Sequence, residues 1–154
     1  MPRIAPLAAL IVVAAAGCSE VQRAEYPTYA AAERSSAVAR GWIPQFVPRS
    51  AVEIVEAHDL DINTQRLRFR APEPDLRTMT AQLRPLPFAA AREPGIRSPH
   101  IGGDWPPELR KSVLQTPRAT LSFYTLPDTA GSGHCLAVDW VTHTVYVWSC
   151  TGVT

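Results

Sequence analysis

The most constraining feature of this sequence is a seventeen-residue run near its end, HCLAVDWVTHTVYVWSC, at positions 134–150. It contains two segments rich in apolar, β-branched and aromatic residues, Leu136–Val141 and Thr144–Trp148. The polar pair Thr142–His143 separates them. Two such segments joined by a short polar turn are typical of a β-hairpin. We therefore expect the rest of the chain to pack around a C-terminal hairpin.

The two cysteines of this run fix an expected register. If the turn is centred between residues 142 and 143, Cys135 lies directly opposite Cys150. One face of the hairpin then carries the apolar residues that should meet the core: Leu136, Val138, Trp140, Val145 and Val147. The other face carries the cysteines with Asp139, Tyr146 and Trp148.

The other end of the chain has the pattern of an export signal. Arg3 precedes an apolar run from Ile4 to Gly17, which is too short for a comfortable membrane span. The ending Ala15-Ala16-Gly17-Cys18 resembles a bacterial lipobox, although Ala15 replaces the larger residue usual there. The resemblance implies a signal peptide over residues 1–17 and a lipid-modified, palmitate-bearing Cys18. The alternative is ordinary cleavage near Ala16, which would leave Cys18 as a free thiol.

Export determines how the remaining cysteines are interpreted. With Cys18 acylated, Cys135 and Cys150 form an even pair in an oxidising compartment, and we predict a disulfide between them. The 16-residue loop that this bond closes corresponds to about 3 kcal/mol in the chain-entropy model. Two reduced cysteines in a cytosolic protein are the alternative. A metal site at His134 beside Cys135 lacks the usual paired-cysteine spacing.

Length and charge limit the classes of function. The 137 residues from Cys18 onward suffice for one domain with one core. Once Arg3 is removed with the signal, basic and acidic residues are equal in number, so the net side-chain charge is zero. A nucleic-acid-binding protein normally has a basic face, and no nucleic-acid partner is expected. No cofactor motif is present.

We divide the exported chain into a tether over residues 18–27 and a single domain over residues 28–154. The alanine-rich segment Tyr29–Arg40 predicts a helix, with Thr28 as its N-cap and Gly41 at its C-terminus.

The irregular segment that follows, residues 41–50, contains two prolines and the aromatic pair Trp42 and Phe46. These rings are expected to pack in the core, and a ligand cleft lined by them is the alternative.

A second hairpin is predicted from residues 54–61 and 66–71, which alternate between apolar and polar side chains. A turn at Asn63-Thr64 places Leu60 opposite Leu67, and it pairs aspartates with arginines on the other face. Asp59, Asp61 and Asn63 also have the spacing that begins an EF-hand loop. Thr64 and Arg70 occupy its glycine and glutamate positions, which argues against calcium. The arginines are interpreted as a solvated face, or alternatively as a site for an anionic envelope component.

The remainder completes the predicted fold. Residues 74–84 have helical spacing of Leu76, Met79 and Leu83, and residues 119–126 alternate as a strand. Between them lies a long loop, residues 85–107. The fold class is thus α+β: an antiparallel sheet of about five strands, formed by two hairpins and one strand, with two main helices packed on it.

Four short motifs carry a family resemblance. They are Arg40-Gly41-Trp42-Ile43-Pro44, Pro48-Arg49-Ser50-Ala51, His58-Asp59-Leu60-Asp61 and Arg68-Phe69. The chain resembles small bacterial lipoproteins of no established activity, some of which carry a YbbD head domain. The resemblance implies an anchored small α+β domain and supplies no catalytic residue.

The sequence favours a lipid-anchored envelope protein without catalytic activity, acting as a protein-interaction or structural module. Ser19 after the cysteine, rather than Asp, favours the outer membrane, with the domain facing the periplasm. Catalysis is not expected, because the four histidines are scattered and no Gly-x-Ser-x-Gly or His-Glu-x-x-His motif is present. The alternative is a small-ligand-binding module with an aromatic-lined cleft near the 85–107 loop. Its contact residues would be Trp42, Phe46, Trp105 and Trp148.

Overall fold

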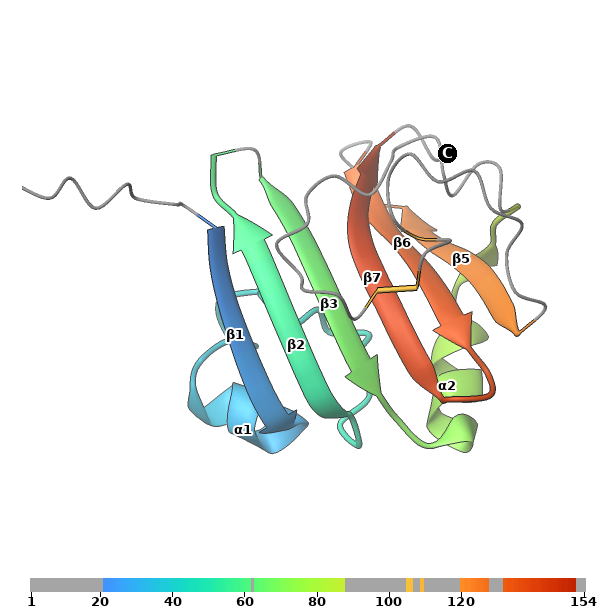
Figure 1. Cartoon of the computed structure of the whole chain (residues 1–154), viewed down its shortest axis with the longest axis horizontal. Coiled ribbons are helices and arrows are strands. Elements are labelled where there is room, and N and C mark those ends of the chain that lie inside the picture. The colour runs from blue at the N-terminus through green and yellow to red at the C-terminus, as the bar shows by residue number, and fades with distance from the viewer. Residues whose placement is uncertain are drawn as a thin grey trace, which may run out of the picture.

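The described part of the chain folds into one antiparallel sheet. The computed structural model describes residues 21–61, 63–87, 105–106, 109, 120–127 and 132–151. Within these residues, seven strands lie in the order β1-β2-β3-β7-β6-β5-β4 (Figure 1). The strands are β1 (Val21–Thr28), β2 (Val52–Asp59), β3 (Thr64–Arg70), β4 (Arg84–Pro85), β5 (Leu121–Pro127), β6 (Ser132–Asp139) and β7 (Thr144–Thr151). The helices are α1 (Tyr29–Arg34) and α2 (Glu73–Thr80).

The predicted five-stranded α+β arrangement with two main helices is wrong. The structure is mainly a seven-stranded sheet, and its two described helices have only six and eight residues. One additional strand, β1, comprises residues that we assigned mostly to a tether, and it forms an edge of the sheet by pairing with β2. The other, β4, is a two-residue strand that pairs with β5. The expected succession of three antiparallel C-terminal strands, β5, β6 and β7, is confirmed.

Helix α1 begins where the sequence predicts and ends six residues early. The hydroxyl oxygen of Thr28 accepts a hydrogen bond from the amide of Ala31, as an N-cap should. The helix stops at Arg34 because Ser36 adopts a left-handed conformation, with φ of 64°. Gly41 also has a positive φ, 79°, but it lies in the turns beyond the helix rather than at its end.

Both hairpin turns are built in the same way, and both are longer than expected. In the β2–β3 turn, Asp59 accepts the amide of Asp61 at 3.0 Å, and Asn63 closes the turn with φ of 47°. In the β6–β7 turn, Asp139 accepts the amide of Val141 at 3.1 Å, and His143 closes it with φ of 52°. Each turn therefore has four residues between its paired ends, where we expected a two-residue tip.

The longer turns shift both registers away from the predicted ones. Val138 faces Val145, so Cys135 and Cys150 are diagonal neighbours rather than direct partners. Their sulfur atoms nevertheless lie at bonding distance, 2.18 Å, with Cα atoms 5.8 Å apart. Because the shift is an even number of residues, each side chain keeps its predicted face.

In the first hairpin, the shift removes the predicted acid–base pairs. Asp59 faces Thr64 and Arg66 faces Ala57. Arg66 is buried, and this burial lowers the pKa of its guanidinium to about 10. Arg70 at the other end of the strand is exposed and lies 3.1 Å from Glu53. The arginines therefore do not form the single solvated face that the alternation suggested.

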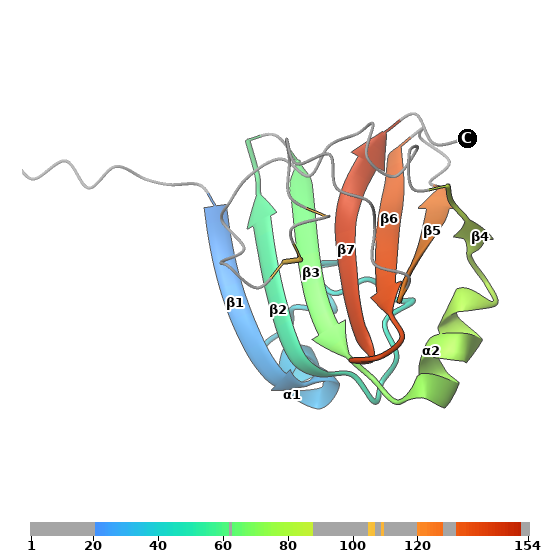
Figure 2. The same ribbon diagram turned by 45° about the vertical axis from the view of Figure 1, so that its right-hand side comes forward.

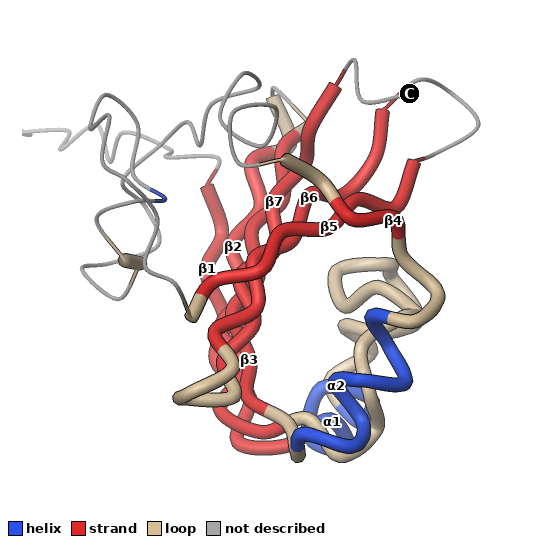
Figure 3. Tube along the Cα trace, turned by 90° about the vertical axis from the view of Figure 1, so that its right-hand side faces the viewer, coloured by secondary structure: helices blue, strands red, loops and turns tan. Residues whose placement is uncertain are grey.

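Both faces of the sheet are covered by apolar side chains. Figures 2 and 3 show the helices and the 35–51 loop on one face. The main core lies between them and the sheet, and its largest fully buried members are Ile43, Ile54, Leu67, Phe69, Leu76, Leu136, Val138, Val145 and Val147. A second cluster on the opposite face contains Trp105, Leu109, Leu121, Phe123, both cysteines, Tyr146 and Trp148. Burial on both faces explains why β7 has four consecutive apolar or aromatic residues, Val145–Trp148.

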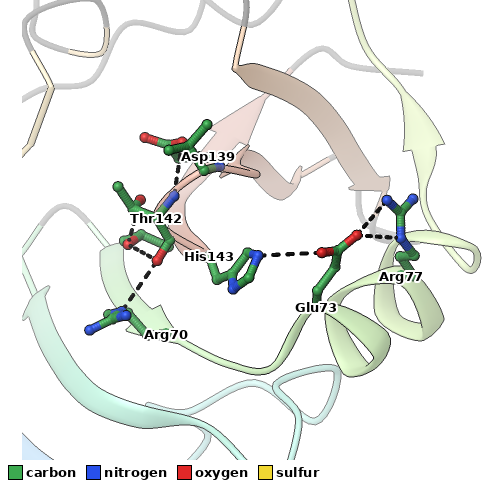
Figure 4. Close-up of polar contacts among 8 residues, drawn as sticks. Arg70, Glu73, Arg77, Asp139, Thr142 and His143 are labelled. Atoms are coloured by element: carbon green, nitrogen blue, oxygen red, sulfur yellow. Dashed lines mark hydrogen bonds and ion pairs between the residues drawn. The ribbon is translucent and has the colours of Figure 1, made fainter.

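Polar contacts connect the β6–β7 turn to α2 (Figure 4). His143 Nε2 lies 3.5 Å from Glu73, which also accepts two hydrogen bonds from Arg77 within the helix. Arg70 donates to the carbonyl of Thr142 from the neighbouring strand. The hydrogen bond from Arg77, followed by the positive charge of Arg77, lowers the pKa of the Glu73 carboxyl group.

Candidate functional site

A cleft of about 860 Å³ lies at the end of the sheet that contains the β2–β3 turn. We call it the Trp42 cleft. Its lining comes from the 40–46 segment, the end of β2, the start of β3, and the facing ends of β6 and β7. The lining side chains include Trp42, Phe46, His58, Gln65, His134 and Ser149.

The wall of the cleft is a stack of side chains around Trp42. The imidazole of His58 stacks on the indole, with ring centroids 4.2 Å apart and an angle of 28°. The guanidinium carbon of Arg40 lies 3.8 Å from the centre of the same indole. A cation this close to a tryptophan ring is attracted by the π electrons. Trp42 is half-buried, so part of the stack remains accessible from the cleft.

Beneath this stack lies a buried carboxyl group. Glu56 Oε1 is 2.7 Å from His58 Nδ1, and the two side chains are 0% and 6% exposed. Burial raises the pKa of Glu56 above its ordinary value of 4.5, and the hydrogen bond with His58 offsets only part of that effect. The other two polar atoms of the pair, Glu56 Oε2 and His58 Nε2, are buried without a hydrogen-bond partner.

Gln65 connects the two sides of the cleft. Its Nε2 donates to the main-chain carbonyl of Trp42, and its Oε1 lies 3.4 Å from His134 Nε2. The ring of Phe46 meets His134 edge-on at 5.5 Å. The hydroxyl of Ser149 is held by the backbone of Gln65, donating to its carbonyl and accepting from its amide. The amide side chain of Gln65 therefore fixes the 40–46 segment against the sheet.

A second hollow of about 470 Å³ runs on toward α2, and we call it the α2 groove. Its walls are the 45–50 segment and one side of α2. The Trp42 cleft and the α2 groove share Gln45, Phe46, Gln82 and Leu126, so the two hollows adjoin one another. Phe46 stands where the two meet.

The structure separates the four aromatic residues proposed as contacts. Trp42 and Phe46 line the Trp42 cleft, whereas Trp105 and Trp148 pack together in the cluster on the opposite face of the sheet. Trp105 is the only one of them from the 85–107 loop, most of which lies outside the described residues, as does Cys18.

Sequence reasoning missed the contributions of Glu56, Gln65 and His134. Glu56 had a detectable signal, since it is an acidic residue on the same strand face as Ile54 and His58. Gln65 and His134 gave no comparable signal, because the long-range packing of β3, β6 and the 40–46 segment brings them together.

The lining of the cleft combines several kinds of side chain. Aromatic rings, an arginine, imidazoles and amides provide apolar contact and both kinds of hydrogen-bonding group. Among the described residues, no cluster of three histidine, cysteine or acidic side chains could hold a metal ion. Within the same residues, no helix has the length and apolar character needed to span a membrane.

The model of the YbbD head domain matches residues 20–70. This segment is YbbD head domain-like. The resemblance inferred from the four sequence motifs is thereby confirmed, whereas lipidation stays a prediction. No curated protein and no solved structure matches the chain.

The YbbD head domain-like segment supplies the core of the candidate site. It spans β1, α1, β2 and β3, and it therefore contains Trp42, Phe46, His58 and Gln65. The opposite wall, with His134, comes from β6, outside the matched residues. The matched segment alone would not enclose the cleft.

Proposed function

We propose that this protein is a lipid-anchored envelope protein without catalytic activity, which binds a protein partner through the Trp42 cleft and the α2 groove. The observation that carries the proposal is that the two hollows are open and adjoin one another at four shared residues. Two adjoining open hollows can accommodate a segment of polypeptide.

The lining supports a peptide ligand. Gln45 and Gln82 are exposed and lie in both hollows. Each amide side chain can donate and accept hydrogen bonds, as a peptide backbone requires. Phe46 between them offers an aromatic surface, and aromatic side chains are common energetic centres of protein interfaces. The mixture of amides and one ring favours recognition of a main chain with an apolar side chain.

The absence of catalytic activity is also part of the proposal. Ser149 provides the serine hydroxyl of the cleft lining, and serine is a common nucleophile in enzymes. This hydroxyl makes two hydrogen bonds with the backbone of Gln65. His58 is directed by Glu56 but is covered by the Trp42 stack. A serine nucleophile is activated by an adjacent base, and these contacts do not pair Ser149 with one.

The proposed location follows from the export signal predicted at the N-terminus. Cys18 would carry the lipid, the outer membrane would hold the protein, and the domain would face the periplasm. The oxidising periplasm favours a bond between Cys135 and Cys150, whose sulfur atoms lie at bonding distance. Mass spectrometry of the mature N-terminus tests the anchor: a diacylated, N-acylated cysteine is expected, and a free thiol at Cys18 would contradict it.

A photo-crosslinking amino acid at Gln82 tests the partner. In intact cells it should capture a specific envelope protein, which peptide mapping then identifies. The matched control places the same probe at Val141, which is exposed in the β6–β7 turn and does not line either hollow. Equal products from both positions, or none from Gln82, would contradict a protein-binding groove.

A small ligand is the second candidate, and the dimensions of the Trp42 cleft favour it. Its volume of about 860 Å³ falls within the range of about 300–1,000 Å³ usual for small-molecule sites. The lining also includes the aromatic rings of Trp42 and Phe46. Small-molecule extraction from purified native protein would distinguish the candidates, because a protein-binding groove should release no stoichiometric ligand.

A further inference from the structure

The start of the first strand and the β2–β3 turn lie at the same end of the sheet. Val21, the first residue of β1, pairs with Asp59, the last residue of β2. Asp59 is followed directly by the turn at residues 60–63. Figure 1 shows the start of β1 beside this turn, while the helices and the β6–β7 turn lie at the opposite end.

The distance along the chain between the proposed anchor and this end is short. Three residue steps separate Cys18 from Val21, and they can span at most about 11 Å when fully extended. β1 itself has eight residues, which corresponds to about 27 Å at the usual rise of a strand. The lipid attachment point therefore lies closer to the β2–β3 turn than to the far end of β1.

Leu60, the first residue of that turn, is suited to a lipid surface. Leu60 is 61% exposed, although it is a large apolar side chain. The turn that carries it is fixed by the hydrogen bond from the amide of Asp61 to Asp59. Exposed Asp61 places negative charge beside Leu60, which disfavours a strongly anionic leaflet and favours a zwitterionic one.

We infer that the β2–β3 turn rests on the bilayer, with Leu60 in contact with zwitterionic phospholipid at the membrane interface. The inference rests on the proposed lipid anchor at Cys18. Leu60 and Asn63 also line the Trp42 cleft, so the cleft lies at the membrane-proximal end of the domain. The partner would then be engaged close to the membrane surface, and the α2 groove would extend away from it.

Depth-dependent fluorescence tests the orientation. With Cys18 acylated and the other two cysteines bonded, a cysteine introduced by Leu60→Cys is the single free thiol. It is labelled with an environment-sensitive nitrobenzoxadiazole dye, and the lipidated protein is reconstituted in phosphatidylcholine vesicles containing spin-labelled lipid. The matched positions are Thr28→Cys at the far end of β1 and Val141→Cys in the opposite turn, both exposed. A blue-shifted emission and quenching are expected at position 60 alone.

Other outcomes separate this inference from the proposal it depends on. If the wild-type protein floats with vesicles but the dye at position 60 is quenched no more than at 28 or 141, the anchor stands and the orientation is wrong. Strong quenching at position 28 together with 60 would mean that β1 lies along the membrane, which also overturns the inference. If the wild-type protein does not float and its Cys18 is unmodified, both statements fail.

Discussion

His58 Nδ1 lies 2.7 Å from Glu56 Oε1, and the carboxyl group of this pair is completely buried in the sheet. A charged carboxylate is costly in such a place unless hydrogen bonds replace the lost water. Only one of its two oxygens has a partner, because Glu56 Oε2 is unpaired. The pair therefore makes the stability of the domain depend on pH.

Replacing the acid tests this dependence. Burial raises the pKa of Glu56 in the folded protein above the value near 4.5 that it has in the unfolded chain. The contribution of Glu56 to the free energy of unfolding is therefore fully present below pH 4.5, and it is lost as pH rises through the folded pKa. Unfolding by urea at several pH values between 4 and 8 should show this decline in the wild type and a flatter profile in Glu56→Gln. Glu53→Gln is the control, because Glu53 is exposed. Parallel profiles for wild type and Glu56→Gln would contradict the assignment.

Gln65 should be important for the shape of the cleft. Gln65→Met keeps the length of the side chain but removes the bond to the carbonyl of Trp42 and the contact with His134. We expect a loss of about 1–3 kcal/mol in unfolding free energy, the usual cost of leaving partly buried groups without their partners. The near-ultraviolet circular dichroism of Trp42 should also change. Gln22→Met, at an exposed position of β1, should leave both measurements unchanged.

Contacts between the β6–β7 turn and α2 predict an effect at acid pH. The hydrogen bond from Arg77, with smaller contributions from its charge and from His143, lowers the pKa of Glu73. Because this pKa is lower in the folded protein than in the unfolded chain, the Glu73 carboxylate stabilises the fold at pH values above 4.5. The stabilisation is lost as pH falls through the folded pKa. Glu73→Gln should thus reduce the melting temperature slightly at pH 6 and leave it unchanged at the acid extreme. High salt should diminish the difference, since the groups are exposed.

The hairpins show how far the sequence could predict this fold. Alternation assigned Leu136, Val138, Val145 and Val147 to the core face of the C-terminal hairpin, and these assignments are confirmed. The predicted registers of both hairpins were wrong, because we placed a two-residue turn at the most polar dipeptide of each. An aspartate followed four residues later by Asn63 or His143 was the better signal, since these types tolerate the left-handed conformation that closes each turn.

Other features could not be predicted from local patterns. Apolar and polar residues do not alternate clearly in β1, and it forms a strand because its backbone pairs with β2. Gln65 meets His134 across 69 positions of the sequence, so the cleft depends on the order of strands rather than on any motif. Trp42 and Phe46 could be singled out as aromatic residues between prolines, but their separation from Trp105 required the assembled sheet.

The diagonal placement of Cys135 and Cys150 leads to the last prediction. Cys135 faces Trp148, and Cys150 faces Gly133. A bond between the two sulfur atoms would therefore join diagonally placed residues of the adjacent strands β6 and β7. Closing this 16-residue loop should stabilise the folded state by about 3 kcal/mol, because it restricts the unfolded chain. Urea unfolding of the wild type with and without dithiothreitol should reveal that difference. The variant with both Cys135→Ala and Cys150→Ala should be insensitive to the reductant, and a wild-type midpoint that dithiothreitol does not move would show that the sulfurs are not bonded.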